Sequence, residues 1–206
     1  MKNDNAESCD MIPVECHPLE PFLPAGARVL MLGSFPPPHA RWSMEFYYPN
    51  FQNDMHRILG LLFYGNKSHF VDDVNKRFDR GRIIEFCTAK GIAFYDTATV
   101  VRRLKANASD KFLEVVEPTD VGALLRQIPD CCTIVVTGEK AAETVLFSLD
   151  RHTQTYPEIG EYVEFDFEGR GMKLWRMPSS SRAYPLALEK KAAFYGVMFA
   201  EAGVLD

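Results

Sequence analysis

Short apolar segments recur along this chain of 206 residues, and stretches with helical spacing of hydrophobic residues separate them. The segments from Arg28 to Leu32, from Ile92 to Asp96 and from Thr133 to Thr137 have the composition of buried strands. The stretch from Tyr162 to Phe167, a Gly-rich turn and the stretch from Met172 to Met177 predict a hairpin. Strands that alternate with helices form parallel sheets covered by helices. We therefore predict an α/β fold, a three-layer α/β/α sandwich with a central, mostly parallel sheet of four strands.

Hydrophobic spacing and capping residues predict the helices between these strands. The first helix opens at Asn53 or Asp54, and Gly91 is the residue expected to end another. The segment from Val100 to Pro118 is polar and basic and has no clear period, so it is predicted to be an excursion from the fold. The other predicted helices are one or two over 70–90, broken near Gly81, and single helices over 120–128, 139–149 and 186–202.

Length and composition limit the class of protein. A length of 206 residues fits one domain, which we expect over 17–206 after a flexible tail over 1–16. No apolar run could span a bilayer and no secretory segment is recognisable, so we expect a cytoplasmic protein. The net charge of −5 argues against a protein that wraps nucleic acid electrostatically. None of the five cysteines forms a Cys-x-x-Cys pair, so we expect reduced structural cysteines and no metal site.

The residues that follow the first strand are candidates for chemistry, because ligands bind beyond the carboxyl ends of parallel strands. Gly33, Ser34 and Phe35 precede three prolines, which carry no N–H, so Ser34 and Phe35 are the backbone donors of this loop before His39. Such donors suit a carbonyl or a water, although a stiff turn is the simpler interpretation. Asn53 could cap the helix or orient a water through its amide. The aromatic residues between the loop and Asn53 suit stacking on a planar ring, or packing in the core: they are Trp42, Phe46, Tyr47, Tyr48 and Phe51.

The loop after the last strand, from Ser179 to Pro185, is predicted to lie at the same edge of the sheet. The hydroxyls of Ser179, Ser180 and Ser181 could bind phosphate, and Arg182 could enter a nucleic-acid groove. A serine-rich turn with a solvated arginine is the alternative interpretation.

Taken in order, these motifs resemble the uracil-DNA glycosylase superfamily, and most of all its hypoxanthine-DNA glycosylase branch. The likeness covers about residues 17–206. The motifs that carry it are Gly33-Ser-Phe-Pro36, Tyr47-Tyr48, Asn53, Gly91-Ile-Ala-Phe-Tyr-Asp96 and Met177-Pro-Ser-Ser-Ser181.

The resemblance implies a monofunctional glycosylase that extrudes and removes a damaged or mismatched base, uracil or hypoxanthine, during DNA repair. By this likeness Asn53 is the catalytic residue, Ser34 and Phe35 contact the base or the water, and Tyr48 stacks on the base. Gly33, Tyr47 and Thr137 complete the base site, and Ser179 to Arg182 press into the duplex. Four features depart from the family pattern. Pro37 replaces a glycine, Arg182 replaces a proline, and Thr137 and Gly138 stand where relatives often present an asparagine. The final loop also lacks the histidine of the uracil-specific members.

The implied partner is DNA, with no cofactor and no metal, and we expect a monomer. Because the chain is acidic, we predict a narrow basic rim over the pocket, made by Arg102, Arg103, Lys105, Arg176 and Arg182. Two other functions remain open. One is a non-catalytic protein that binds nucleic acid or a base with the same fold. The other is a hydrolase using a serine of 179–181, for which the chain lacks the Gly-x-Ser-x-Gly turn and an obvious histidine partner.

Overall fold

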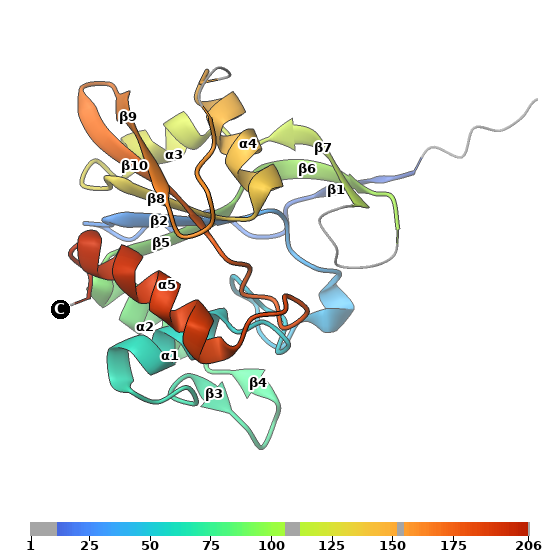
Figure 1. Ribbon diagram of the computed structural model, residues 1–206. Helices are drawn as coiled ribbons and strands as arrows, with labels where there is room; N and C mark the ends of the chain where they lie inside the picture. The colour runs from blue at the N-terminus through green and yellow to red at the C-terminus, as the bar shows by residue number, and fades with distance from the viewer. Residues whose placement is uncertain (1–11, 106–111, 152–154, 206) are drawn as a thin grey trace, which may run out of the picture.

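The computed structural model describes residues 12–105, 112–151 and 155–205 (Figure 1). Its central sheet has five strands in the order β5-β2-β8-β10-β9, and the first four are parallel. The strands are β2 Val29–Gly33, β5 Ile92–Asp96, β8 Thr133–Thr137, β9 Tyr162–Phe167 and β10 Arg170–Met177. The prediction of four strands is wrong by one. The predicted hairpin is present, and β9 joins the sheet as an antiparallel edge strand along β10.

Helices lie on both faces of this sheet (Figure 1). On one face are α1 Met55–Tyr64, α2 Arg80–Lys90 and α5 Leu188–Glu201, and on the other are α3 Val121–Gln127 and α4 Glu139–Ser148. Capping residues fix several ends. The side chains of Asp79 and Asp120 accept hydrogen bonds from the first turns of α2 and α3, and Gly91 ends α2 in the left-handed conformation.

The segment before α2 is a hairpin and not a helix, which corrects the prediction for 70–79. Val71–Asp72 (β3) pairs with Arg77–Phe78 (β4). The Asp72 carboxylate accepts hydrogen bonds from the backbone N–H of Asn75 (3.1 Å) and from Arg77 Nε (3.1 Å), and Lys76 has a φ of 52°. An aspartate that binds its own turn competes with helix formation, so the helix begins only after Asp79.

A second sheet, not predicted, lies beside the first. It contains β1 Val14–Cys16, β6 Ala98–Arg103 and β7 Leu113–Pro118 in the order β1-β6-β7, all antiparallel. The expected excursion over 100–118 is therefore mostly sheet, although 106–111 lies outside the described residues. Its charges are matched across strands, because Arg103 pairs with Glu15 and Arg102 with Glu114. The last residues of the predicted flexible tail, Val14–Cys16, form β1 of this sheet. Residues 1–11 of the predicted tail lie outside the described part.

The packing of the two sheets positions the loop after β2. Every residue of β2 and β5 is buried, as expected for central parallel strands. A separate small cluster joins the Phe35 ring to Ala98 and Val101 of β6. The loop after β2 is thus held between the central sheet and the second sheet.

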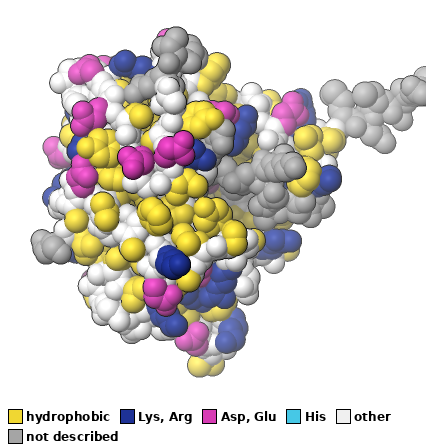
Figure 2. Space-filling view, viewed as in Figure 1, with side chains coloured by type: hydrophobic (Ala, Val, Ile, Leu, Met, Phe, Trp, Pro, Cys, Tyr) yellow, Lys and Arg dark blue, Asp and Glu magenta, His cyan; other side chains and the backbone are white. Residues whose placement is uncertain are grey.

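The surface shows no broad basic area on the face seen in Figure 2, where basic, acidic and hydrophobic side chains are interspersed. On α5, Phe194 and Val197 are 38% and 60% exposed. No described helix has the length and apolar character needed to cross a membrane.

Candidate functional site

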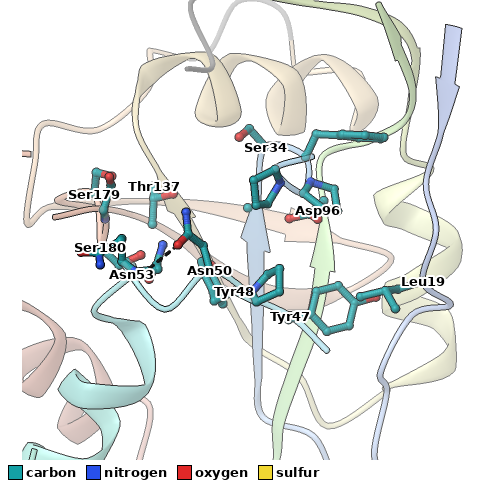
Figure 3. Close-up of a pocket in the computed structure, with 17 residues that line it drawn as sticks. Leu19, Ser34, Tyr47, Tyr48, Asn50, Asn53, Asp96, Thr137, Ser179 and Ser180 are labelled. Carbon is teal, nitrogen blue, oxygen red and sulfur yellow. Dashed lines mark hydrogen bonds between the residues drawn. The ribbon is translucent and has the colours of Figure 1, made fainter. Parts of the chain in front are cut away.

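A cavity of about 150 Å³ lies at the carboxyl ends of β2, β5, β8 and β10 (Figure 3). Gly33, Asp96 and Thr137, the last residues of three neighbouring strands, contribute to its lining. All but one of the site residues expected from the sequence line it. They are Gly33, Ser34, Phe35, Tyr47, Tyr48, Asn53, Thr137, Ser179, Ser180 and Ser181, and the exception is Arg182.

The loop after β2 contains Ser34 and Phe35, and both residues line the cavity. The backbone N–H of Thr97 donates to the Gly33 carbonyl (2.8 Å), and the Arg103 guanidinium donates to the Pro36 carbonyl (3.0 Å). These contacts fix the loop at both ends. The N–H groups of Ser34 and Phe35 donate to no other described residue.

The two tyrosines of the aromatic segment have different roles. Tyr47 is 3% exposed, and its hydroxyl donates to the Glu20 carbonyl (2.7 Å). Burial, and then the charge of Asp96, raise the pKa of Tyr47. Tyr48 has a φ of 52°, a conformation that is rare for a bulky residue and persists only where neighbours hold it. The Tyr47 side chain is therefore buried and held by its hydrogen bond, whereas the Tyr48 ring is the more exposed of the two in the cavity.

Asn53 has a structural contact as well as a place in the cavity. Its side-chain oxygen accepts a hydrogen bond from the backbone N–H of Met55 (2.9 Å), so it supports the start of α1. Its own N–H donates to the Asn50 carbonyl (2.8 Å) (Figure 3). The helix N-cap position itself belongs to Asp54, whose side chain makes no cap bond. A carbonyl oxygen has two lone pairs, so Asn53 can serve the helix and still orient a water.

Asp54 joins the Asn53 segment to the loop after β10. Its side chain is 9% exposed and binds two cations, Arg182 (Nε to Oδ1, 2.9 Å) and Lys191 (Nζ to Oδ2, 3.2 Å). Lys191 is itself 1% exposed and also donates to the Ser181 carbonyl (2.7 Å). We refer to Asp54, Arg182 and Lys191 as the loop clamp. Arg182 thus lies against Asp54 instead of lining the cavity, and Asp54 is not placed as a base within the cavity.

The serine loop is a turn whose hydroxyls bind its own backbone. Ser179 Oγ accepts from the N–H of Ser181 (3.2 Å), and Ser181 Oγ accepts from the N–H of Ala183 (3.2 Å). The Ser180 carbonyl accepts from the N–H of Asp54 (2.8 Å). Among the described residues no histidine lines the cavity, so this geometry does not favour a serine hydrolase.

Asp96 was not assigned a role from the sequence, yet it lines the cavity and is 7% exposed. Its Oδ2 lies 2.8 Å from Nε2 of His17, which belongs to the extended segment before β2. His17 Nδ1 contacts the Leu19 backbone, 2.8 Å from the carbonyl oxygen and 3.1 Å from the nitrogen. The strand-end position of Asp96, in register with Gly33, is the signal that could have identified it. Its contact with His17 spans 79 residues and leaves no local pattern.

The lining of the cavity does not support the predicted basic rim. Arg103 is held by Glu15 and Pro36, Arg102 by Glu114, and Arg176 donates to the Pro157 carbonyl (3.2 Å). None of the five basic residues lines the cavity. On β6, Arg102 pairs within the second sheet, whereas Arg103 also binds the Pro36 carbonyl of the loop after β2.

The cysteines and other metal ligands are dispersed in the described part of the chain, where no group of three or more His, Cys, Asp or Glu side chains could hold a metal ion. Burial raises the pKa of the Cys131 thiol to about 12 and raises that of Cys87 as well. Both thiols therefore remain protonated at neutral pH, as expected for structural cysteines.

Comparisons with known proteins show which fold this chain is similar to. No family model matches the chain, and no curated protein matches it. It is similar to a solution NMR structure from Methanosarcina acetivorans described as a putative uracil DNA glycosylase, with a TM-score of 0.62 and 18% sequence identity. The match covers 93% of this chain and 99% of the other. The chain has a uracil-DNA-glycosylase-like fold. At this identity the likeness concerns the fold alone and does not extend to the hypoxanthine branch.

Proposed function

We propose that this protein is a DNA glycosylase that hydrolyses the bond between deoxyribose and a deaminated or mismatched base, uracil or hypoxanthine. One observation carries this proposal. Asn53, Tyr48 and the donors of Ser34 and Phe35 line a single cavity at the carboxyl edge of a glycosylase-like sheet. A planar, uncharged ring would meet a stacking face, a water-orienting amide and hydrogen-bond donors in this cavity.

The base would have to leave the DNA stack to reach this cavity. Extrusion costs a few kcal/mol, and a lesion or mismatch reduces that cost. Stacking against Tyr48 would return about 1–3 kcal/mol. The loop of Ser179, Ser180 and Ser181 lines the cavity and would lie against the DNA, with Arg182 beside it at the surface.

The chemistry would depend on leaving-group stabilisation and on placement of the water. The bond from C1′ to the base nitrogen breaks, and its electron pair departs with the base. Amide donors of Ser34 and Phe35 would stabilise the negative charge of the departing base. Asn53 would orient the water whose oxygen bonds to C1′. The base takes up a proton as the water loses one, so that the products are a free base and an abasic sugar.

The experiment is an excision assay on duplexes that carry one uracil or one hypoxanthine. Asn53→Ser is the test variant, because a serine can still bind the N–H two residues ahead but is too short to hold the same water. Asn66→Ser is the matched control, since Asn66 Oδ1 accepts from the N–H of Ser68 at 2.9 Å in the same way but lies outside the cavity. We expect abasic sites with the wild type and with Asn66→Ser, and a loss of at least about a hundredfold with Asn53→Ser.

A non-catalytic base-binding protein of the same fold is the second candidate. It is favoured by the hydrogen bond that Asn53 Oδ1 accepts from the first residue of α1 and by Pro37, which has no N–H to offer. The same assay separates the two functions. A protein that retains lesion-bearing duplexes but leaves every base attached would support the binding function and contradict the glycosylase.

A further inference from the structure

Arg57, in the first turn of α1, is a buried cation with no ion-pair partner among the described residues. It is 7% exposed. Burial, and then the charge of Arg182, lower the pKa of Arg57, but an arginine keeps its proton at neutral pH. The charges of Asp54 and Asp73 act in the opposite direction, and neither carboxylate binds the guanidinium directly. A buried charge without a carboxylate partner is costly, so the contacts that Arg57 does make have to offset this cost.

Those contacts lead to the segment that carries Asn53. Arg57 Nη1 donates to the Phe51 carbonyl (3.1 Å) and to the Asn53 carbonyl (3.2 Å). The two carbonyls flank Gln52 in the chain, and Gln52 and Asn53 line the cavity. Arg57 itself does not line it. Any effect of Arg57 on the cavity therefore passes through the segment 51–53.

Two phenylalanine rings hold the guanidinium. Its Cζ lies 4.4 Å from the centroid of the Phe51 ring and 5.0 Å from that of the Phe78 ring. Phe78 is a buried residue of β4, and its ring centroid is 5.3 Å from that of Phe51. A cation over the face of an aromatic ring is attracted by the ring quadrupole, which offsets part of the cost of burial. The β3–β4 hairpin thus supports Arg57 from the side opposite to the carbonyls that it binds.

Asn53 is held on both sides of its Cα atom. Its N–H donates to the Asn50 carbonyl (2.8 Å), its side-chain oxygen accepts from the N–H of Met55 (2.9 Å), and its carbonyl accepts from Arg57. Because a peptide group is planar, the contact with Arg57 fixes the plane that follows Asn53. With the planes on both sides fixed, the direction of the Cα–Cβ bond is fixed as well.

We propose that Arg57 is a positioning residue for the reaction at Asn53. By holding the carbonyls of Phe51 and Asn53, it sets the direction in which the Asn53 amide meets the water. This inference rests on the proposed function, because it concerns the placement of the same water. Arg57 touches neither the base nor the water in this account.

The role needs the shape of a guanidinium and not only its charge. A guanidinium is planar and has several N–H groups, so it can lie over two rings while one of its nitrogens reaches two carbonyls. The ammonium of a lysine is compact, strongly hydrated and has no plane to stack. Arg57→Lys therefore keeps the charge and removes the geometry. A displacement of Asn53 by about 1 Å would slow the reaction by up to about a hundredfold.

The test measures excision by the full chain in a single turnover, from a duplex with one uracil or one hypoxanthine. We expect Arg57→Lys to reduce the rate at saturating enzyme about ten- to a hundredfold. The enzyme concentration that gives half of this rate should change by less than about threefold. In an Asn53→Ser background, Arg57→Lys should reduce the rate further by less than about threefold, because residues that act as a unit are not additive.

Arg170→Lys is the matched control. The Arg170 guanidinium also binds backbone carbonyls, those of Ile128 (2.9 Å) and Leu125 (3.0 Å), and its Cζ lies 5.6 Å from the centroid of the Phe167 ring. Arg170 is the first residue of β10, whereas the cavity lies at the carboxyl end of that strand. Its replacement should leave the excision rate within about threefold of the wild type.

Phe78→Leu is a second variant that leaves Arg57 in place and removes one of its rings. We expect the excision rate to fall about three- to tenfold, and again only while Asn53 is present. This variant decides the question if Arg57→Lys does not show the far-ultraviolet circular dichroism of the folded wild type.

An excision rate within about threefold of the wild type in the folded Arg57→Lys variant would overturn the inference. An equal loss with and without Asn53 would also overturn it, since the effect would then be a general one on the fold. So would an equal loss in Arg170→Lys, or a loss confined to duplex affinity, which would indicate that Arg57 contacts DNA.

A wild type that releases no base would contradict the glycosylase, and the placement of Asn53 is then read by NMR. The side-chain amide signals of Asn53 are assigned by their loss in Asn53→Ser. They should shift in Arg57→Lys and stay unchanged in Arg170→Lys, which would keep Arg57 as the residue that positions Asn53 in a binding protein. Unchanged Asn53 signals in Arg57→Lys would overturn the inference whether or not a base is released.

Discussion

The two sides of the cavity are built in different ways. One side is formed by strand ends: Gly33 and Asp96 are paired in register, and His17 holds the carboxylate. The other side is formed by two loops, 50–54 and 179–182, which are joined by backbone hydrogen bonds and by the loop clamp. The strand side is fixed by the sheet itself. The loop side depends on an ion pair buried between segments 137 residues apart.

This difference suggests a division of roles. Strand ends are rigid and suit the recognition of a base, because sites built on strands are more precise than sites built on loops. The loop side carries Asn53 and the residues proposed to meet DNA, and it has to accept a large, charged partner. The predictions below test whether base recognition and bond cleavage can be lost separately.

The largest effect is expected from Lys191→Met on the loop side. This change leaves the buried Asp54 carboxylate with Arg182 as its remaining cation, and removal of one member of a buried pair costs about 3–5 kcal/mol. We expect a free energy of unfolding about 3 kcal/mol lower, measured by urea denaturation. Lys190→Met, on the exposed side of the same helix, should change it by less than about 0.5 kcal/mol. Under folding conditions the variant should still bind free base but excise poorly. Loss of both together would contradict separate roles.

Acid should lower the stability of the fold through His56 of α1. His56 is fully buried, and its Nε2 lies 2.9 Å from the Tyr47 carbonyl oxygen. Burial lowers the pKa of His56 to about 4. The unfolded chain takes up a proton near pH 6.5, and the folded chain does so only near pH 4. The free energy of unfolding therefore falls as the pH decreases through this window, by up to about 3 kcal/mol. His56→Gln should have a shallower slope between these pH values, and an identical slope would show that His56 is not responsible.

On the strand side, Gly33→Ala should displace the Asp96 carboxylate, because the new Cβ would lie 2.2 Å from Oδ1. Overpacking of this kind costs about 1–3 kcal/mol of stability. Because Asp96 lines the cavity, base binding should weaken more than about tenfold. Gly171→Ala is the control, since an added Cβ there meets no atom within 4 Å. Unchanged base binding by Gly33→Ala would contradict this effect of the displaced carboxylate.

The smallest effect is expected for Arg182→Ala. Its side chain is 41% exposed, so its bond to Asp54 should contribute less than about 1 kcal/mol to stability. If Arg182 also contacts a phosphate in the complex, the variant should release about one ion fewer on binding DNA, as measured by the salt dependence of the binding constant. A stability loss as large as that of Lys191→Met would show that the two cations of the loop clamp are equivalent.

The sequence predicted the elements whose signal is local. The strands from Ile92 to Asp96 and from Thr133 to Thr137 were predicted with their observed bounds, and Gly91 ends α2 as expected. The predictions for the segments 70–79 and 100–118 were wrong. In the first segment Asp72 binds its own turn, and in the second the strands pair with each other and with β1. Neither feature appears in a hydrophobic period.

The candidate site was predicted from the order of its motifs, and ten of its eleven expected residues line one cavity. What the sequence did not reveal are contacts between distant residues. His17 and Asp96 are 79 residues apart, and Asp54 and Arg182 are 128 apart. The sequence therefore suggested an Arg182 guanidinium available for DNA, whereas in the structure Arg182 Nε donates to the Asp54 carboxylate.

The most direct test is the amount of free base released in a single turnover, measured by chromatography with enzyme in excess over a duplex carrying one hypoxanthine or one uracil. A glycosylase built on this cavity should release one base for each abasic site formed, and Asn53→Ser should release almost none while still binding the duplex. Retention of the duplex with no base released by the wild type would contradict the glycosylase and leave a protein that only binds its base.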